Sequence, residues 1–530
     1  MDTTSANQII SETSDPTETR ELRVGFRTLS IVFVVLVLIA SVIIRFYTKS
    51  QMWLDEAQTF NISQEPLSKL FHYLREDGSP PLYYFLSHVW DSIFGTSNLA
   101  ARSLAGIISV ITLPIAWMVG NKVGGKQVAF ASLIIFGTSP YLATYATTER
   151  MYSLLTLEGL LALWLTLLLR ESPTFINAGL FALVIASLEY THYWSFFLIG
   201  ALGVLFLYDA IRYHTKVWLY GLGAMTVGSL TFLPWLSDFL FQRAHTGTPW
   251  AQTVSVSAIS STVGQFAGGV TQPNTGGDFL KILYLLLVAL ALFGYAKNSR
   301  TIELDLRTRP GIRQYALIFV LTMVLGITAS SLFGVGFQAR YAAVAFPFLA
   351  ICIAYAFKTL RSGHIRRVAL GLTAILGLIA SIPNISQNRT EAGQVAAVIK
   401  HNYQAGDVVA YCPDQLGPDG SRMLQGLDLK MIAFPRGNSP QIVNWIDYLA
   451  TIKHSSPGQF VQKLLTAAGP THAIWYDWMP NYKGFGNDCA AIADALYLAR
   501  GKQVARLSPN PLVYEPSYLL EFPRLKSPGN

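Results

Sequence analysis

Apolar residues along this chain gather in long uninterrupted runs, unlike the short alternating patterns of a soluble domain. Each run is about 17 to 22 residues long, and a helix of that length crosses the hydrocarbon core of a bilayer. The pattern predicts a polytopic α-helical membrane protein with about eleven transmembrane helices. They are expected at residues 29–44, 98–119, 127–146, 151–169, 175–190, 193–211, 217–236, 279–296, 314–334, 338–357 and 368–383.

The pattern changes at both ends of this apolar core, which spans residues 28–383. Residues 1–27 are rich in Ser, Thr and acidic side chains, which is typical of a disordered tail. Residues 384–530 alternate strand-like and helical segments and so predict a small α/β domain. The expected strands are Asp407–Cys412, Thr471–Trp478 and Leu512–Tyr514, and the expected helices are Ser456–Ala468 and Asp488–Arg500.

The distribution of Lys and Arg predicts the orientation of the chain. Most of the basic residues between apolar runs fall in every second loop, and positively charged loops stay on the cytoplasmic side. The N-terminus is therefore expected in the cytoplasm. The long segments 46–97, 237–278 and 384–530 are all expected outside.

Composition supports the membrane class. Only 13% of the 530 residues are charged and 52% are apolar, whereas about a quarter of the residues of a soluble protein are charged. The net charge of +8 comes from residues between apolar runs, not from one face of a soluble domain, so a nucleic-acid partner is not expected. Three cysteines exclude a disulfide framework. Whether Cys412 and Cys489 pair stays open, since pairing needs an oxidising compartment and proximity.

Two adjacent carboxylates follow the first predicted span, in the run Trp53-Leu54-Asp55-Glu56-Ala57. Ionisable groups at a membrane boundary are costly unless the site is wet or cationic, so a functional role is the first hypothesis. Neighbouring residues of a helix point about 100° apart, so one acid can face a cavity while the other is a structural acceptor. The alternative is an acidic pair that only complements a helix dipole.

Further polar clusters fall on the same predicted side of the membrane, which separate structural accidents would not favour. Each member also has a structural explanation: Arg150 can reach the headgroups, Glu149 can pair with Arg150, and His192 or Arg340 can serve a helix end. Aromatic residues here are expected to anchor at the interface. The cluster members are Glu149, Arg150, Tyr152, His192 and Arg340, and the expected anchors are Tyr83, Tyr84 and Tyr152.

These motifs carry a family resemblance. The Trp-Leu-Asp-Glu-Ala run at 53–57, Pro-Pro-Leu-Tyr-Tyr at 80–84, Leu-Ala-Ala-Arg at 99–102 and Glu-Arg-Met-Tyr at 149–152 resemble the GT-C glycosyltransferases. More narrowly, they resemble the family 39 branch of protein mannosyltransferases and aminoarabinose transferases. The resemblance covers the membrane core and is strongest over about residues 50–200. The Cys-Pro-Asp-Gln-Leu-Gly-Pro run at 412–418 is similar to the external tails of actinobacterial members.

The resemblance implies a GT-C fold and transfer of a sugar from a polyprenyl phosphate, outside the membrane and with inversion. Asp55 matches the catalytic acid, with Glu56 as its neighbour. Arg150 and Arg340 match basic residues near the lipid phosphate, and His192, Glu149 and Tyr152 are further candidates for substrate binding. No cofactor is implied, although a divalent cation at Asp55 stays open because carboxylate and phosphate oxygens suit one.

The expected function is therefore a glycosyltransferase of a bacterial plasma membrane, surrounded by membrane lipids. Mannose or arabinofuranose is the expected sugar, and an envelope glycan, glycolipid or protein is the expected acceptor. A carboxylate base suits this reaction, since a hydroxyl is a poor nucleophile while a phosphate leaves readily once cations hold its charge. A transporter or lipid flippase is the alternative and needs ionisable residues at mid-membrane depth, for which Glu158 and Glu189 are the candidates. A scaffold protein, the third reading, would tolerate the loss of Asp55.

Overall fold

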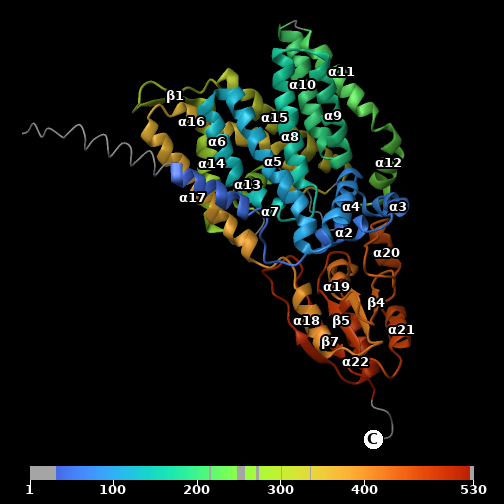
Figure 1. The fold of residues 1–530 in the computed structure, drawn as a ribbon. Coiled ribbons are helices and arrows are strands. Elements are labelled where there is room, and N and C mark those ends of the chain that lie inside the picture. The colour runs from blue at the N-terminus through green and yellow to red at the C-terminus, as the bar shows by residue number, and fades with distance from the viewer. Residues whose placement is uncertain are drawn as a thin grey trace, which may run out of the picture.

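The computed structural model describes residues 31–213, 216–247, 257–269, 274–299, 301–334 and 336–525. A bundle of helices forms the larger part, and an α/β domain at the C-terminal end of the chain lies against one end of the bundle (Figure 1). The predicted tail 1–27 lies outside the described residues.

The bundle contains seven described helices that are long and apolar enough to cross a membrane, or nine if two bent pairs each count as one span. The expected count of about eleven is therefore not confirmed, although each predicted segment overlaps an apolar helix. Two further predicted spans correspond to the shorter helices Ile31–Ile43 and α9 (Phe175–Thr191). The seven are α5 (Asn98–Gly124), α8 (Tyr152–Glu171), α10 (Ser195–Tyr213), α14 (Thr275–Phe293), α15 (Pro310–Phe333), η2 with α16 (Ala339–Ala345 and Phe346–Thr359) and α17 (Gly363–Ser386).

Proline explains both bends. The predicted span 127–146 is broken by 53° between α6 (Lys126–Gly137) and α7 (Pro140–Ala146). Pro140 opens α7 and disfavours a helical conformation at Ser139, whose side chain accepts from the backbone of the new helix. The second pair, bent by 41°, joins α11 (Val217–Leu230) to η1 (Leu233–Trp235) and α12 (Leu236–His245), with a proline inside η1.

Three short helices connect the first apolar helix to α5 and lie between the bundle and the C-terminal domain (Figure 1). They are α2 (Leu54–Ser63), α3 (Leu67–Asp77) and α4 (Leu82–Phe94). Tyr83 and Tyr84 on α4 have no exposed surface. Their interpretation as interfacial anchors is wrong, because they pack inside the protein and not against headgroups. The bundle also contains α13 (Ser257–Gly268) and a two-stranded hairpin of β1 (Gly294–Ala296) and β2 (Ile302–Leu304).

The C-terminal domain is built on a five-stranded sheet with the order β4-β3-β5-β7-β6. β3 is parallel to β4 and β5, whereas β7 is antiparallel to β5 and β6. The strands are β3 (Val408–Cys412), β4 (Lys430–Ala433), β5 (Ile474–Trp478), β6 (Val504–Leu507) and β7 (Tyr518–Phe522). The helices are α18 (Ala392–Asn402), η3 (Asp414–Leu416), α19 (Gly417–Met423), α20 (Tyr448–His454), α21 (Pro457–Ala468) and α22 (Asp488–Arg500).

Alternate residues of β3 and β5 face opposite sides of the sheet, so each face has its own core. One core contains side chains of α21 and α22, and the other contains side chains of α18. A disulfide joins Cys412 at the end of β3 to Cys489 on α22, which answers the question that spacing left open. The predicted strand Leu512–Tyr514 is wrong: this segment forms no strand, and the ring of Tyr514 instead packs against Trp53, the residue before α2.

Candidate active site

The two acids of the first motif lie in the first turn of α2. The residue before the helix, Trp53, has no side-chain oxygen to cap it. The backbone N–H of Leu54 instead donates to Oε1 of Glu515 in the C-terminal domain, over 2.9 Å. A free N–H of a first helical turn is thereby satisfied. The position of Asp55 and Glu56 thus depends on a residue far along the chain.

Glu56 is fully buried and fully bonded. Arg102 on α5 donates to both of its oxygens, each over 2.7 Å. Nη1 of Arg389 lies 3.5 Å from Oε2, and the backbone N–H of Glu149 donates to Oε1 over 2.9 Å. Burial alone would raise the pKa of Glu56, but Arg102 and Arg389 hold it below its usual value. Glu56 is therefore a structural acceptor that joins α2 to three other segments.

Asp55 faces a different environment. Its side chain is 16% exposed, and Oδ2 lies 3.2 Å from Nη2 of Arg340. The Arg340 guanidinium also lies 5.7 Å from the ring centre of Trp53 and 5.6 Å from that of Tyr341, within the range of cation–π attraction. Asp55 is thus the accessible acid of the pair, in a cationic and aromatic surrounding.

Arg150 is fixed from two helices beside the same acid. Its Nη1 donates to Oγ1 of Thr59 over 2.8 Å, to the hydroxyl of Tyr84 over 3.2 Å and to the backbone carbonyl of Asp55 over 3.4 Å. Tyr84 in turn donates to Asp77 over 2.7 Å. These contacts hold the guanidinium inside the protein and do not direct it to the headgroups.

Three buried donors around Asp55 have no hydrogen-bond acceptor among the residues that the structure describes. They are Nε of Arg150, Nε of Arg340 and the hydroxyl of Tyr152. Buried donors are nearly always bonded in folded proteins, so three beside one carboxylate mark a place built for an acceptor. A ligand with several anionic oxygens, such as a phosphate, has the required chemistry.

His192 lies directly after α9 and borders the same place. Its ring centre is 5.1 Å from that of Tyr341 and 6.0 Å from that of Tyr152. Burial, with Arg150 and Arg340, lowers the pKa of His192 to about 3. Nδ1 accepts from the backbone N–H of Trp194 over 3.1 Å. His192 is therefore neutral and carries its proton on Nε2, so it offers a neutral donor.

Glu149 does not take part in this cluster through its side chain. It accepts a hydrogen bond from Ser87 on α4 over 2.7 Å and forms no ion pair with Arg150. Burial raises its pKa well above the usual value, and the nearby acids Asp91 and Glu56 act in the same direction. The pairing of Glu149 with Arg150 that the sequence suggested is absent from the described residues.

The structure thus brings Asp55, Arg150, Tyr152, His192 and Arg340 together and turns Glu56 and Glu149 away. The motif at 99–102 contains Arg102, but the sequence did not indicate that Arg102 binds Glu56. Arg389 and Glu515 carried no local signal, because they lie 333 and 461 residues from the positions they bind. Only the folded chain reveals them.

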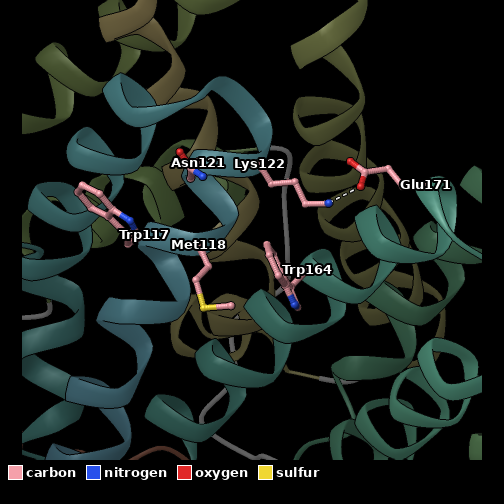
Figure 2. A pocket seen from close by; sticks show the side chains of 6 residues that line it. All are labelled: Trp117, Met118, Asn121, Lys122, Trp164 and Glu171. Atoms are coloured by element: carbon pink, nitrogen blue, oxygen red, sulfur yellow. Dashed lines mark hydrogen bonds and ion pairs between the residues drawn. The ribbon is translucent and has the colours of Figure 1, made fainter.

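A cavity of the bundle lies elsewhere. It measures about 440 Å³ and is formed by α5 and α8 near their C-terminal ends (Figure 2). Its lining residues are Trp117, Met118, Asn121, Lys122, Trp164 and Glu171, with an ion pair between Lys122 and Glu171. Since α8 begins at Tyr152, this cavity is at the opposite end of the bundle from Asp55.

Within the described ranges, no group of three or more His, Cys, Asp or Glu side chains is arranged to hold a metal ion.

No family model matches this chain, and no curated protein matches it. Among solved structures, it is similar to ArnT from Cupriavidus metallidurans in the apo state, with a TM-score of 0.60 and 12% identity over 94% of this chain and 98% of ArnT. ArnT bound to undecaprenyl phosphate matches with a TM-score of 0.58 and 12% identity over 93% and 97% of the two chains. The apo oligosaccharyltransferase of Archaeoglobus fulgidus matches with a TM-score of 0.44 and 13% identity over 84% and 69%. The likeness to ArnT confirms the fold class that the resemblance implied.

Proposed function

We propose that this chain, which has the fold of ArnT, is a membrane glycosyltransferase that takes a sugar from a polyprenyl phosphate. The observation that carries the proposal is the set of three buried, unbonded donors of Arg150, Arg340 and Tyr152 around the partly exposed carboxylate of Asp55. The structure of ArnT with undecaprenyl phosphate supports a lipid of this kind as the donor.

The reaction assigned to this site is a direct displacement. Asp55 takes the proton of the acceptor hydroxyl as the hydroxyl oxygen attacks the anomeric carbon. The bond from that carbon to the phosphate oxygen breaks, and its electron pair leaves with the lipid phosphate. Arg150 and Arg340 hold the charge that develops there. Attack opposite the leaving group inverts the anomeric centre, and one carboxylate suffices because the leaving group needs no proton.

Neutral groups complete the candidate active site. The hydroxyl of Tyr152 and Nε2–H of His192 are donors without charge, suited to sugar hydroxyls or to a phosphate oxygen. The rings of Trp53 and Tyr341 flank Arg340 and form its apolar side. Arg340 contacts both the base and the proposed phosphate site, so it positions the two reacting partners relative to each other.

We place the C-terminal domain outside a bacterial plasma membrane and the N-terminus in the cytoplasm. The Lys and Arg residues of alternate loops support this orientation. The disulfide between Cys412 and Cys489 supports it independently, because such bonds persist in oxidising compartments. Mannose or arabinofuranose as the sugar, and an envelope glycan, glycolipid or protein as the acceptor, remain proposals that rest on the family resemblance.

The transporter alternative gains no support from the bundle interior. Glu158 accepts from Ser187 and, over 2.8 Å, from Thr191. Glu189 accepts from Ser229 over 2.6 Å. Each acid is bound by neighbouring hydroxyls, and among the described residues no hydrogen bond or ion pair joins the two acids into the chain of ionisable groups that a coupled pathway needs.

Transfer of labelled sugar from a panel of polyprenyl-phosphate sugars by the purified protein tests the proposal. We expect Asp55→Asn to lower turnover at least about a hundredfold, the loss typical of a removed general base. Glu65→Gln, just after α2, is the matched control and should keep wild-type turnover. Turnover by a folded Asp55→Asn variant at the wild-type rate would contradict the assignment. Absence of transfer from every polyprenyl-phosphate sugar would contradict the function itself.

A further inference from the structure

A second cavity, of about 190 Å³, lies where the chain leaves the first apolar helix and meets the start of α5. Neither Asp55 nor Arg150 nor Arg340 lines it, so it is separate from the candidate active site. Three of its lining residues are cations, Arg45, Lys49 and Arg102, and none is an acid.

Arg45 is the most unusual of these residues. It has no exposed surface, and its guanidinium donates to Oγ of Ser109 and to the backbone carbonyls of Gly137 and Phe136, over 2.7 to 3.0 Å. All its partners are neutral: within the described chain no carboxylate forms an ion pair with it. A buried charge without a counter-ion is costly. The fold keeps this cation beside a cavity, where an anion can compensate it.

The other two cations differ in whether a carboxylate neutralises their charge. Arg102 is neutralised by Glu56 through two hydrogen bonds. Lys49 is exposed, and its ammonium group forms no ion pair with any residue that the structure describes. The lining therefore has two uncompensated positive charges, those of Arg45 and Lys49.

The rest of the lining suits an amphiphilic anion. Hydroxyl and amide groups provide further hydrogen-bond donors for the oxygen atoms of an anion. Phe46 and Leu99 form an apolar edge, and Leu99 is 62% exposed. The cavity opens at the end of an apolar helix, the depth at which the headgroups of a bilayer lie. The donors besides the cations are the hydroxyl of Thr48 and the side-chain amides of Gln51 and Asn98, since the hydroxyls of Ser50, Ser103 and Thr147 already donate to backbone carbonyls.

We propose that this cavity binds an anionic phosphate group, carried by a membrane lipid or free in solution, at a site distinct from that of the sugar donor. Binding has a consequence for α2. The carbonyls of Ser50 and Gln51, which line the cavity, accept from Arg102 over 2.8 and 3.1 Å, and Arg102 holds Glu56. An anion here fixes the segment that leads into the candidate catalytic helix.

Native mass spectrometry of the detergent-purified full chain tests the site without reference to sugar transfer. The probes are phosphatidylglycerol, zwitterionic phosphatidylcholine and inorganic phosphate. We expect phosphatidylglycerol to bind more tightly than phosphatidylcholine. Lys49→Ala should weaken that binding about fivefold, the effect of one basic residue on an anionic lipid. Lys69→Ala, an exposed lysine of α3, is the matched control and should not change it.

Competition separates the two sources of the anion. Displacement of phosphatidylglycerol by inorganic phosphate shows that the phosphate group suffices, while binding of the lipid without competition shows that the lipid is the ligand. Lys49→Glu repeats the test by charge reversal at an exposed position, so it avoids the folding risk of changing buried Arg45. Equal binding of both lipids, equal effects of Lys49→Ala and Lys69→Ala, or no saturable binding of any probe would overturn the proposal.

Discussion

Oε1 of Glu515 accepts the backbone hydrogen bond of Leu54 over 2.9 Å, across 461 residues of sequence. Next to it, the ring of Tyr514 meets that of Trp53 edge-on at 5.2 Å. These two contacts hold the start of the helix that carries Asp55. The C-terminal domain therefore takes part in the candidate active site, because it positions the helix that carries Asp55.

The first prediction concerns the second oxygen of Glu515. Oε2 of Glu515 and Oδ1 of Asp419 are buried and have no donor among the described residues, although the two carboxyl groups interact. Burial and Asp419 raise the pKa of Glu515 well above its usual value, so we infer that the pair shares one proton held by Glu515. Glu515→Gln should keep wild-type transfer, because its amide donates as the protonated acid does. Glu515→Ala should destabilise the start of α2 by about 1 kcal/mol, the effect of one lost helix cap, and should lower transfer because α2 carries Asp55.

The pH profile distinguishes this positioning role from a merely structural one. As the pH rises and Glu515 loses its proton, two carboxylates face each other, and the wild-type rate should fall. In Glu515→Gln this alkaline fall should disappear. The charged or titratable groups that face the pair are Asp55 and Tyr482 around Glu515, and Asp477 and Tyr411 around Asp419. Identical alkaline limbs in the wild type and Glu515→Gln would refute the shared proton.

The stability of the C-terminal domain should depend on pH in a defined direction. Burial raises the pKa of Asp477 to about 8, from about 4 in the unfolded chain. The folded state then holds a proton that the unfolded state has lost. Stabilisation is fully present below the unfolded value and is lost as the pH rises towards about 8. The midpoint of thermal unfolding should fall over this range in the wild type and less in Asp477→Asn; an equal fall in both would show that Asp477 does not contribute.

Glu56 should behave as a structural residue. Removing one partner of a buried ion pair leaves the other uncompensated and costs about 3 to 5 kcal/mol, so Glu56→Gln should lower the unfolding midpoint and the yield of folded protein. Asp55→Asn should change neither, because Asp55 is partly exposed and has a single ion-pair partner. If the folded fraction of Glu56→Gln retains transfer, the separation of roles holds. A stable but inactive Glu56→Gln would instead assign chemistry to Glu56.

Sequence patterns predicted the structural features that neighbouring residues determine. Long apolar runs located the bundle helices, and the adjacent acids at 55 and 56 indicated one open and one structural position. The break at Pro140 was missed because hydropathy does not register a bend. The run Leu512–Tyr514 has the composition of a strand, but its aromatic ring packs on Trp53. The bonds of Arg389 and Glu515 to α2 depend on tertiary packing, which one unaligned sequence does not encode in any window.

The last prediction separates charge from geometry at the proposed phosphate site. Arg150→Lys and Arg340→Lys keep one positive charge but lose Nε and the planar pair of donors. Each lost hydrogen bond to a charged group costs about 1.5 to 3 kcal/mol, or about tenfold to a hundredfold in kcat/KM for the lipid-linked donor. Arg243→Lys on α12, where the guanidinium lies 4.9 Å from the ring of Phe333, is the matched control and should leave kcat/KM unchanged. Because a site that needed only positive charge would tolerate all three substitutions alike, equal rates across the set would show that the unbonded Nε donors do not bind the leaving group.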